Sequence, residues 1–403
     1  MIDVKEIRRH FKIYDKYKDL TYLDSAASAL KLKEVTSSME NFMNYNGTNV
    51  HRGVYNLSYE ATNMYEETRK VVADFIGAKE DEIVFTRGTT DSLNMIATSY
   101  GLTYISEGDE IISSELEHHS SQMPWLNVAL KKKATLKYIN LVNNRITIEE
   151  FKKVLTPKTK VVALTHVSNV LGYVTPIKEI IKLAHEVGAI VIVDAAQSAP
   201  HMKLNVKDLD CDFLAFSGHK LMGPNGVGVL YGKKALLDKM PPRDFGGDMA
   251  EDVYTTHMTY KDAPYKFEAG TPMVAEVIAL KEAIKYLEDI NLDEVAKYEA
   301  YLKDLAIAEL KKIPEVEIYN PDCETGIISF NIKGCHPHDA ASVYDKDNVC
   351  IRAGHHCAEL IMHHLKVVGT LRASFYIYND IEDVKRFIAA TKEAVDFFKM
   401  FDL

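Results

Sequence analysis

The segment Phe213-Leu-Ala-Phe-Ser-Gly-His-Lys220 decides the fold class of this chain. Its apolar run ends in small and polar residues and a lysine, and a second apolar run at 227–231 follows a turn rich in glycine, proline and asparagine. Such runs predict two buried strands joined by a tight loop. We therefore expect Lys220 at the end of a strand, which is where α/β proteins carry their catalytic and ligand-binding residues.

Another apolar run, at 189–193, ends in Asp194. Because it lies close to Lys220 in sequence, we expect the two strands to be sheet neighbours that bring both polar ends to one edge. This pair suits pyridoxal phosphate, since the lysine forms a Schiff base with its aldehyde and the carboxylate pairs with the protonated pyridine nitrogen. Ser217 and His219 are suited to its phosphate. Taken singly, a lysine at the end of a strand is more often simply exposed to solvent, and an aspartate there is more often a capping residue.

The wider pattern predicts an α/β fold. Continuous apolar strands alternate with helices from about residue 80 to 232, which indicates a mostly parallel, seven-stranded-type sheet covered on both faces. After residue 240 the pattern changes to a smaller α+β unit, with a closing helix at about 381–400. A chain of 403 residues exceeds one ordinary core. We expect an N-terminal segment, 1–20, that packs with the small domain, a large cofactor-binding domain, 21–265, and a small C-terminal domain, 266–403.

Composition excludes several classes of function. The net charge of −10 does not indicate the positive surface that binding to nucleic acid or to an anionic membrane requires. No apolar run approaches the roughly 18 residues that span a bilayer, and the N-terminus lacks the apolar core of a signal peptide. We therefore expect a cytoplasmic protein. The five cysteines are scattered without a Cys-x-x-Cys pair, which favours reduced thiols over disulfides.

Three further strand ends carry candidate ligands for the cofactor. The turn Thr86-Arg-Gly-Thr-Thr-Asp91 precedes a helix, whose free N–H groups suit an anion, although an ordinary helix cap has the same pattern. His118, in Glu117-His-His119, can stack on a pyridine ring and move protons, while the competing interpretation is a surface turn. Asn169 follows a strand at 160–164 and is placed to donate to the phenolic oxygen of the cofactor.

The C-terminal part contains a second group of candidate functional residues, at 349–358, which includes Arg352 and Cys357. A thiol on a loop rich in glycine and histidine is accessible, whereas a structural cysteine normally lies in an apolar run. Arg372 is a natural bidentate partner for a substrate carboxylate. A zinc site is the rival interpretation, but adjacent histidines diverge and no second cysteine completes a pair, so we expect no bound metal. The histidines concerned are His336, His338, His355, His356, His363 and His364.

The chain resembles the SufS-type cysteine desulfurases, a group of class-V aminotransferase-like, fold-type I pyridoxal phosphate enzymes. The most specific matching motif is Arg352-Ala-Gly-His-His-Cys357, while the others also fit wider relatives. The histidine-rich segment after Cys357, 359–370, departs from the pattern of the family. The remaining matches run in order along the chain as Tyr22-Leu-Asp-Ser-Ala-Ala, Asn49-Val-His-Arg-Gly, Arg87-Gly-Thr-Thr, Glu117-His-His, Ser168-Asn-Val-Leu-Gly, Val193-Asp-Ala-Ala-Gln, Phe216-Ser-Gly-His-Lys, Phe267-Glu-Ala-Gly-Thr-Pro and Arg372-Ala-Ser-Phe.

The resemblance implies roles for individual residues. Lys220 would bind pyridoxal 5′-phosphate covalently, Cys357 would accept sulfur as a persulfide, and His118 would stack on the ring. Thr271 would reach the phosphate of the partner subunit in a homodimer. The other expected cofactor ligands are Asp194, Gln197, Asn169, Thr90, Ser217 and His219. The expected substrate-binding residues are Arg372, Arg352, Asn169, His51 and Ala27.

The implied reaction converts L-cysteine to L-alanine and passes sulfur to an acceptor protein of SufU or SufE type for iron–sulfur cluster assembly. Gly334-Cys-His-Pro-His338-Asp resembles a segment of the enzymes that work with zinc-bearing SufU, so His338 is a candidate ligand to the zinc of that partner. An ordinary helix start with Asp339 as the cap is the alternative. Rival functions are a selenocysteine lyase, a pyridoxal phosphate aminotransferase that does not use the thiol, and a metal-binding scaffold without cofactor.

Overall fold

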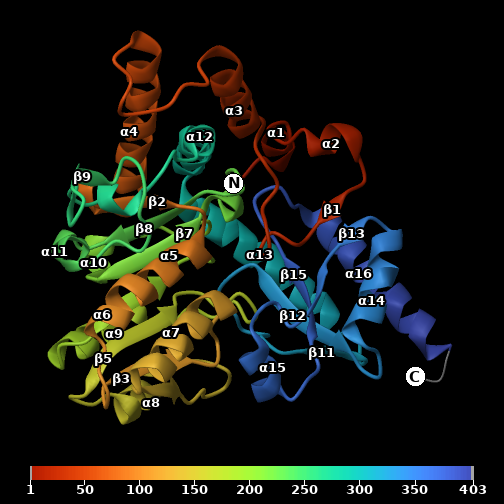
Figure 1. Ribbon diagram of the computed structural model, residues 1–403. Helices are drawn as coiled ribbons and strands as arrows, with labels where there is room; N and C mark the ends of the chain where they lie inside the picture. The colour runs from red at the N-terminus through yellow and green to blue at the C-terminus, as the bar shows by residue number, and fades with distance from the viewer. Residues whose placement is uncertain (1, 401–403) are drawn as a thin grey trace.

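The computed structural model describes residues 2–400, which form two main sheets with their helices and two short two-stranded sheets (Figure 1). The larger sheet has seven strands in the order β2-β8-β7-β6-β5-β3-β4. All its neighbouring strands are parallel except that β8 runs antiparallel to both β2 and β7. The predicted mostly parallel sheet is therefore confirmed. Its strands are β2 Ile83–Thr86, β3 Glu110–Ser114, β4 Thr135–Ile139, β5 Thr159–Thr165, β6 Ile190–Asp194, β7 Phe213–Ser217 and β8 Gly228–Gly232.

Both faces of this sheet are covered, which is why its strands are apolar at nearly every position. In β6, Val191 and Val193 face one apolar core while Ile190 and Ile192 face another. The first core contains side chains of α4 Asn56–Ile76, α9 Ile177–Glu186 and α12 Val274–Ile290. The second contains side chains of α5 Thr89–Ile96 and of α7 His119–Lys132, including the buried Trp125.

The smaller sheet is antiparallel, with the order β11-β12-β15-β14. It packs against three helices around a core of its own (Figure 1). The apolar sequence at 371–378 predicts one strand there, but this strand ends at Ser374, because the chain turns there to bond Leu23 and Asn379. The elements are β11 Val316–Ile318, β12 Ile327–Ile332, β14 Arg352–Gly354 and β15 Thr370–Ser374, with α13 Leu292–Leu310, α14 Pro337–Lys346 and α16 Ile381–Lys399.

The N-terminal residues contact the C-terminal part of the chain. Arg8 donates to Asp383 (2.6 Å) and to the carbonyl oxygen of Tyr378 (2.7 Å), and β1 pairs with β13. Helix α12 packs against α3 and α4 in the core of the large sheet. The three domain boundaries stay a prediction. The elements concerned are α1 Val4–Arg8, α2 Ile13–Lys16, β1 Thr21–Tyr22, α3 Lys33–Tyr45 and β13 Val349–Cys350.

The remaining elements are short, and most of them lie in connections. A two-stranded hairpin, β9 with β10, extends from the large sheet and carries exposed apolar side chains. No helix within residues 2–400 combines the length and the apolarity needed to cross a bilayer. The short elements are η1 Glu80–Glu82, η2 Ala97–Gly101, α6 Leu102–Tyr104, α8 Ile148–Val154, α10 Val206–Leu209, η3 Gly218–Lys220, α11 Lys234–Lys239, β9 Ala250–Val253, β10 Met258–Tyr260, η4 Tyr265–Phe267 and α15 Glu359–Leu365.

Candidate active site

A cavity of about 240 Å³ lies at the carboxyl ends of β5, β6 and β7. Polar strand ends of the large sheet form one part of its wall, and two segments of the smaller sheet form another. The predicted site residues that line this cavity are Ala27, Thr90, His118, Asn169, Asp194, Gln197, Ser217, His219, Lys220, Arg352, Cys357 and Arg372.

Lys220 and Asp194 come from neighbouring strands, as the sequence predicts. Strands β6 and β7 are parallel, with Asp194 opposite Ala215, and Lys220 ends the single 3-10 turn that follows β7. Burial lowers the pKa of Lys220 to about 8, while the nearby Asp194 carboxylate opposes this shift. The pKa of Asp194 is raised by burial, and the N–H of Ala196 and the charge of Lys220 oppose that rise. The cavity thus holds a partly neutral amine near a buried carboxyl.

The start of α5 forms an anion-binding corner of the cavity. Gly88 precedes the helix with φ +149°, a conformation that favours glycine. The Oγ of Ser217 accepts from the N–H of Thr89 (2.7 Å), and Thr90 shares a hydrogen bond with Ser120 (2.7 Å). Burial lowers the pKa of the neighbouring His219 to about 4, so its imidazole is neutral. Hydroxyl groups and a helix N-terminus together suit a phosphate.

His118 is the N-cap of α7 and is held as a neutral imidazole. Its Nδ1 accepts from the N–H of Ser120 (3.1 Å). Burial, followed by the charge of Lys220, lowers its pKa to about 3. With Nδ1 an acceptor, the ring proton lies on Nε2. A capping bond that fixes the ring orientation makes His118 suited to stacking on a flat ligand.

Gln197 and Asn169 have different surroundings. The amide nitrogen of Gln197 donates to the carbonyl oxygen of Ala26 (2.7 Å), and its Oε1 is buried without a partner among the described residues. Asn169 instead donates its side-chain N–H to the carbonyl oxygen of His356 (2.8 Å). Asn169 therefore holds the segment that carries Cys357, which its position after a strand did not predict.

Cys357 is exposed at the cavity and belongs to a segment with unusual backbone geometry. His356 and Cys357 have φ values of +56° and +55°, which are uncommon for residues other than glycine. The N–H of His119 donates to the carbonyl oxygen of Cys357 (2.7 Å), and the buried ring of His356 bonds to Thr370 (2.9 Å). Burial lowers the pKa of His356 to about 2, so this ring stays neutral. His355 and His363 are exposed.

Two arginines lie opposite each other on adjacent strands of the smaller sheet. Arg352 on β14 pairs in register with Arg372 on β15. Both contact Asp24, Arg372 at 3.2 Å and Arg352 at 3.6 Å. Arg372 also donates to the carbonyl oxygen of Asn169 (2.9 Å), but its Nε is buried without a partner among the described residues. Burial lowers the pKa of Arg372 to about 10, so the guanidinium remains charged at neutral pH.

Comparison with known proteins identifies the family. The model of the aminotransferase class-V family matches residues 21–387. The chain belongs to the class-V aminotransferase family. Among full-length relatives, a probable cysteine desulfurase of Halalkalibacterium halodurans is 46% identical over 402 residues, covering 98% of this chain and 99% of the relative. One from Staphylococcus aureus is 47% identical over 403 residues, covering 98% of each chain.

Solved structures of class-V relatives have the same fold. The cysteine desulfurase CsdA from Escherichia coli, in an S-sulfonic acid form, has a TM-score of 0.93 at 37% identity and covers 98% of this chain and 99% of its own. An apo cysteine desulfurase from Thermococcus onnurineus NA1 has a TM-score of 0.94 at 40% identity and covers 98% of each chain. The fold-type I class and the dependence of this class-V enzyme on pyridoxal phosphate are thereby confirmed.

The cavity of this class-V enzyme fits pyridoxal phosphate. Lys220 offers an amine whose lowered pKa suits reaction with an aldehyde, and Asp194 offers a carboxylate for the pyridine nitrogen. The unpaired Oε1 of Gln197 and the hydroxyls at the start of α5 are polar groups still available for a ligand. No group of three or more metal-ligating side chains occurs within residues 2–400.

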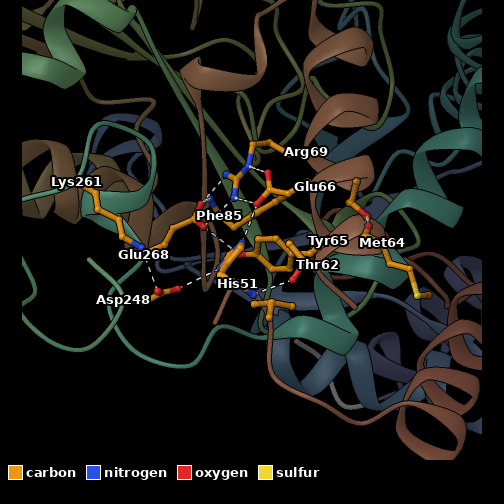
Figure 2. Close-up of polar contacts among 12 residues, drawn as sticks. His51, Thr62, Met64, Tyr65, Glu66, Arg69, Phe85, Asp248, Lys261 and Glu268 are labelled. Atoms are coloured by element: carbon orange, nitrogen blue, oxygen red, sulfur yellow. Dashed lines mark hydrogen bonds and ion pairs between the residues drawn. The ribbon is translucent and has the colours of Figure 1, made fainter. Parts of the chain in front are cut away.

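Two predicted residues do not line the cavity. His51 lies in a separate cluster, where its Nε2 bonds to Glu66 (3.0 Å) and its Nδ1 to Asp248 (3.1 Å) (Figure 2). Thr271 is exposed and lines another hollow beside Thr86. The structure does not bring His51 to the cavity of its own chain, so its assignment as a substrate-binding residue stays a prediction. Thr271 likewise stays a predicted ligand of the partner subunit.

Two carboxyls of the site, those of Asp24 and Glu117, have no role predicted from the sequence. Asp24 forms ion pairs with both arginines, and Glu117 accepts from Ser114 (2.7 Å) and from the N–H of Thr165 (3.0 Å). Burial raises the pKa of Glu117 to about 8, with a contribution from Asp194. Both carboxyls lie within motifs that match the family. An ionisable residue inside such a motif is the sequence feature that could have marked them as site residues.

Proposed function

We propose that this class-V enzyme is a cysteine desulfurase of the SufS type. The observation that carries the proposal is the exposed Cys357 thiol at a cavity that also holds Lys220, Asp194 and the two arginines. Full-length relatives described as probable cysteine desulfurases support the same activity. The overall reaction is L-cysteine plus the thiol of Cys357 giving L-alanine plus a persulfide on Cys357.

Arg372 is the proposed main ligand of the substrate carboxylate. Its guanidinium is buried and charged, and its Nε has no protein partner among the described residues. The exposed Arg352 adds a second positive charge from the adjacent strand. Ala27 lines the cavity as a small neighbour and leaves room for the substrate. An arginine fork binds a carboxylate in one orientation, which directs the sulfur of the substrate towards Cys357.

Lys220 and His118 are the proposed proton carriers. Bound pyridoxal phosphate supplies an electron sink that makes the Cα proton of an amino acid removable. With its pKa lowered to about 8, Lys220 can act as a base near neutral pH. The neutral His118 ring would cover the flat face of the cofactor, and Asp194, Gln197, Thr90, Ser217 and His219 would hold it.

Cys357 is the proposed nucleophile. Its thiolate attacks the sulfur of L-cysteine, the C–S bond of the substrate breaks, and the electron pair of that bond remains with the carbon fragment. Protonation of this fragment gives L-alanine, and the sulfur stays on the enzyme as a persulfide. Because Cys357 is exposed, the persulfide is accessible to a second protein.

The proposed working form is a homodimer. Exposed apolar side chains occur on two segments of the chain, 43–59 and 245–260, and exposed apolar surface is a feature of protein contacts. Thr271 is exposed and would complete the phosphate site of the partner subunit. The exposed side chains are Met43, Tyr45, Val54, Tyr55, Leu57, Tyr59, Phe245, Val253, Tyr254, Met258 and Tyr260.

A SufU- or SufE-type acceptor is the proposed partner, with sulfur delivered to iron–sulfur cluster assembly in the cytoplasm. His338 is exposed on α14, and its Nε2 lies 3.6 Å from the position that a Cβ on Gly354 would take. Gly354 belongs to the same segment as Cys357, so an acceptor at Cys357 would meet this imidazole. An imidazole on the surface can bind the zinc of such a partner.

Alanine release from L-cysteine tests the activity. Wild type and Cys357→Ala are loaded with pyridoxal phosphate and assayed with a thiol reductant. We expect wild type to release alanine and Cys357→Ala to release almost none while still binding L-cysteine. Equal release by both proteins would overturn the thiol mechanism, and faster cleavage of selenocysteine by both would identify a selenium-directed lyase.

A further inference from the structure

A buried arginine–glutamate pair lies outside the cavity, at the edge of the large sheet (Figure 2). The side chain of Arg69 on α4 is 1% exposed and that of Glu268 is 6% exposed. Arg69 donates to Glu268 through Nη1 (2.7 Å) and Nη2 (2.9 Å), to the carbonyl oxygen of Ile83 (2.8 Å) and to Glu66 through Nε (2.8 Å) and Nη2 (3.4 Å). All five N–H groups of its guanidinium are therefore used.

Glu268 is equally well satisfied. Besides the two bonds from Arg69, its carboxylate accepts from the N–H of Phe85 (2.7 Å) and from the hydroxyl of Tyr65 (3.1 Å). The two carboxylate oxygens thus accept four hydrogen bonds. A bidentate pair of this kind fixes direction as well as distance, because both planar groups must lie in one orientation.

The pair occupies the open edge of strand β2. This strand is the first in the sheet, and among residues 2–400 it pairs only with β8. The N–H of Phe85 and the carbonyl oxygen of Ile83 point away from β8, and they bond to Glu268 and Arg69 respectively. An ion pair thus takes the hydrogen-bonding positions that a further strand would use, and it holds β2 in place.

Two loops extend from this anchor. Strand β2 continues into the Thr86–Thr90 turn, which lines the cavity of its own chain. Glu268 is followed directly by Ala269, Gly270 and Thr271. Thr86, Glu268 and Thr271 line one common hollow of about 320 Å³. A displacement of the pair would therefore move both loops together.

We propose that Arg69 and Glu268 are positioning residues for the cofactor phosphate in both subunits of a dimer. Through β2 they place the Thr86–Thr90 turn at the phosphate of their own chain. Through Glu268 they place Thr271 at the phosphate of the partner subunit. The second half rests on the proposed function, which supplies the homodimer and the role of Thr271.

The energetics of buried ion pairs favour a geometric role. Desolvation of the two charges offsets much of their attraction, so such a pair is a weak stabiliser relative to an apolar replacement. Loss of one member, however, leaves an uncompensated buried charge. The hydrogen bonds of Arg69 also continue through Glu66 and His51 to Asp248, which precedes the β9–β10 hairpin (Figure 2).

Glu268→Gln tests the proposal, with Glu299→Gln as the matched control. Glu299 is also buried and pairs with His201 (2.9 Å), but it does not line the cavity. The pyridoxal phosphate dissociation constant, the thermal unfolding of the cofactor-free protein and the amide hydrogen exchange of peptides 83–90 and 268–273 are measured for each variant. Arg69→Lys, which keeps the charge but loses the fork, is the second variant in case Glu268→Gln does not fold.

We expect Glu268→Gln to weaken cofactor binding about tenfold or more and to speed exchange in both peptides. Arg69→Lys should change the same quantities in the same direction, whereas Glu299→Gln should lower the unfolding temperature without changing cofactor affinity. A loss of stability with wild-type cofactor affinity in the folded variants would overturn the proposal. If sedimentation velocity shows a monomer, the proposed placement of Thr271 at the phosphate of the partner subunit would be overturned. None of these readouts uses cysteine turnover, so failure of the proposed activity is detected separately.

Discussion

The backbone N–H of His119 donates to the carbonyl oxygen of Cys357 across 2.7 Å. The first turn of α7 thereby holds the segment that carries the proposed nucleophile. The N-cap of the same helix is His118, the proposed stacking residue. One helix terminus therefore sets the position of the ring-covering imidazole and of the thiol relative to each other.

Arg372 and Arg352 should differ in their effects on substrate binding. Because Arg372 is buried and its Nε has no partner within residues 2–400, Arg372→Lys is expected to raise the KM for L-cysteine by about 100-fold, consistent with loss of a charge-assisted bidentate contact. Arg352→Lys should raise it only a few-fold, since that side chain is exposed. Steady-state kinetics with cofactor-loaded protein measures both values. Equal effects of the two substitutions would contradict the assignment.

Glu117 should give the cofactor-free protein a distinctive pH dependence. Its pKa is raised by burial from 4.5 to about 8, so the folded state binds more protons than the unfolded state between these values. Its contribution to stability is therefore present below pH 4.5 and lost as the pH rises through 8. Glu117→Gln carries no such proton, so its stability relative to wild type should rise by about 3–4 kcal/mol between pH 5 and 8. Urea unfolding at several pH values measures this difference, and a constant difference would contradict a neutral Glu117.

Lys220 should control how fast the cofactor attaches to the cofactor-free protein. Only the neutral amine reacts with the aldehyde, and burial lowers the pKa of Lys220 to about 8. The attachment rate should rise with pH up to about 8 and then level off. Stopped-flow absorbance measures the rate, with Lys220→Ala as the control for non-covalent binding. A rate that keeps rising towards pH 10 would indicate a lysine with an unshifted pKa.

His338 should matter only when an acceptor protein is present. It is exposed and does not line the cavity, so His338→Ala should leave turnover with a small thiol reductant unchanged. With a zinc-bearing SufU-type acceptor, the same variant should lose about tenfold of the acceptor-stimulated rate. His336→Ala is the matched control, because the two rings stack at 5.5 Å and both belong to the start of α14. An equal loss for both variants would assign the effect to the helix start instead.

The large sheet and its polar edge could be predicted because the signals are local and periodic. The strand ending in Asp194 and the strand leading to Lys220 each read as one apolar run, and parallel strands bring their carboxyl ends together. The segment around Cys357 could be predicted as an accessible loop but not in its geometry. The positive φ values at His356 and Cys357 depend on contacts from Asn169 and His119, which come from distant parts of the chain.

Residues whose surroundings come from other elements could not be placed from sequence. His51 lies in a polar loop like many site residues, yet contacts with Glu66 and Asp248 hold it away from the cavity of its own chain. The apolar residues 375–378 read as a continuation of β15, but they are buried beyond the end of the strand. An apolar run indicates burial, and tertiary contacts decide whether it is a strand.

Peptide mass spectrometry after proteolytic digestion tests sulfur transfer to Cys357 directly. The cofactor-loaded enzyme is mixed with one equivalent of L-cysteine without reductant, and the mass of the peptide that contains Cys357 is measured. We expect this peptide to gain one sulfur atom as L-alanine is formed in equal amount, and we expect Cys335 and Cys350 to gain none. Formation of alanine with no added sulfur on Cys357 would contradict sulfur transfer to this thiol.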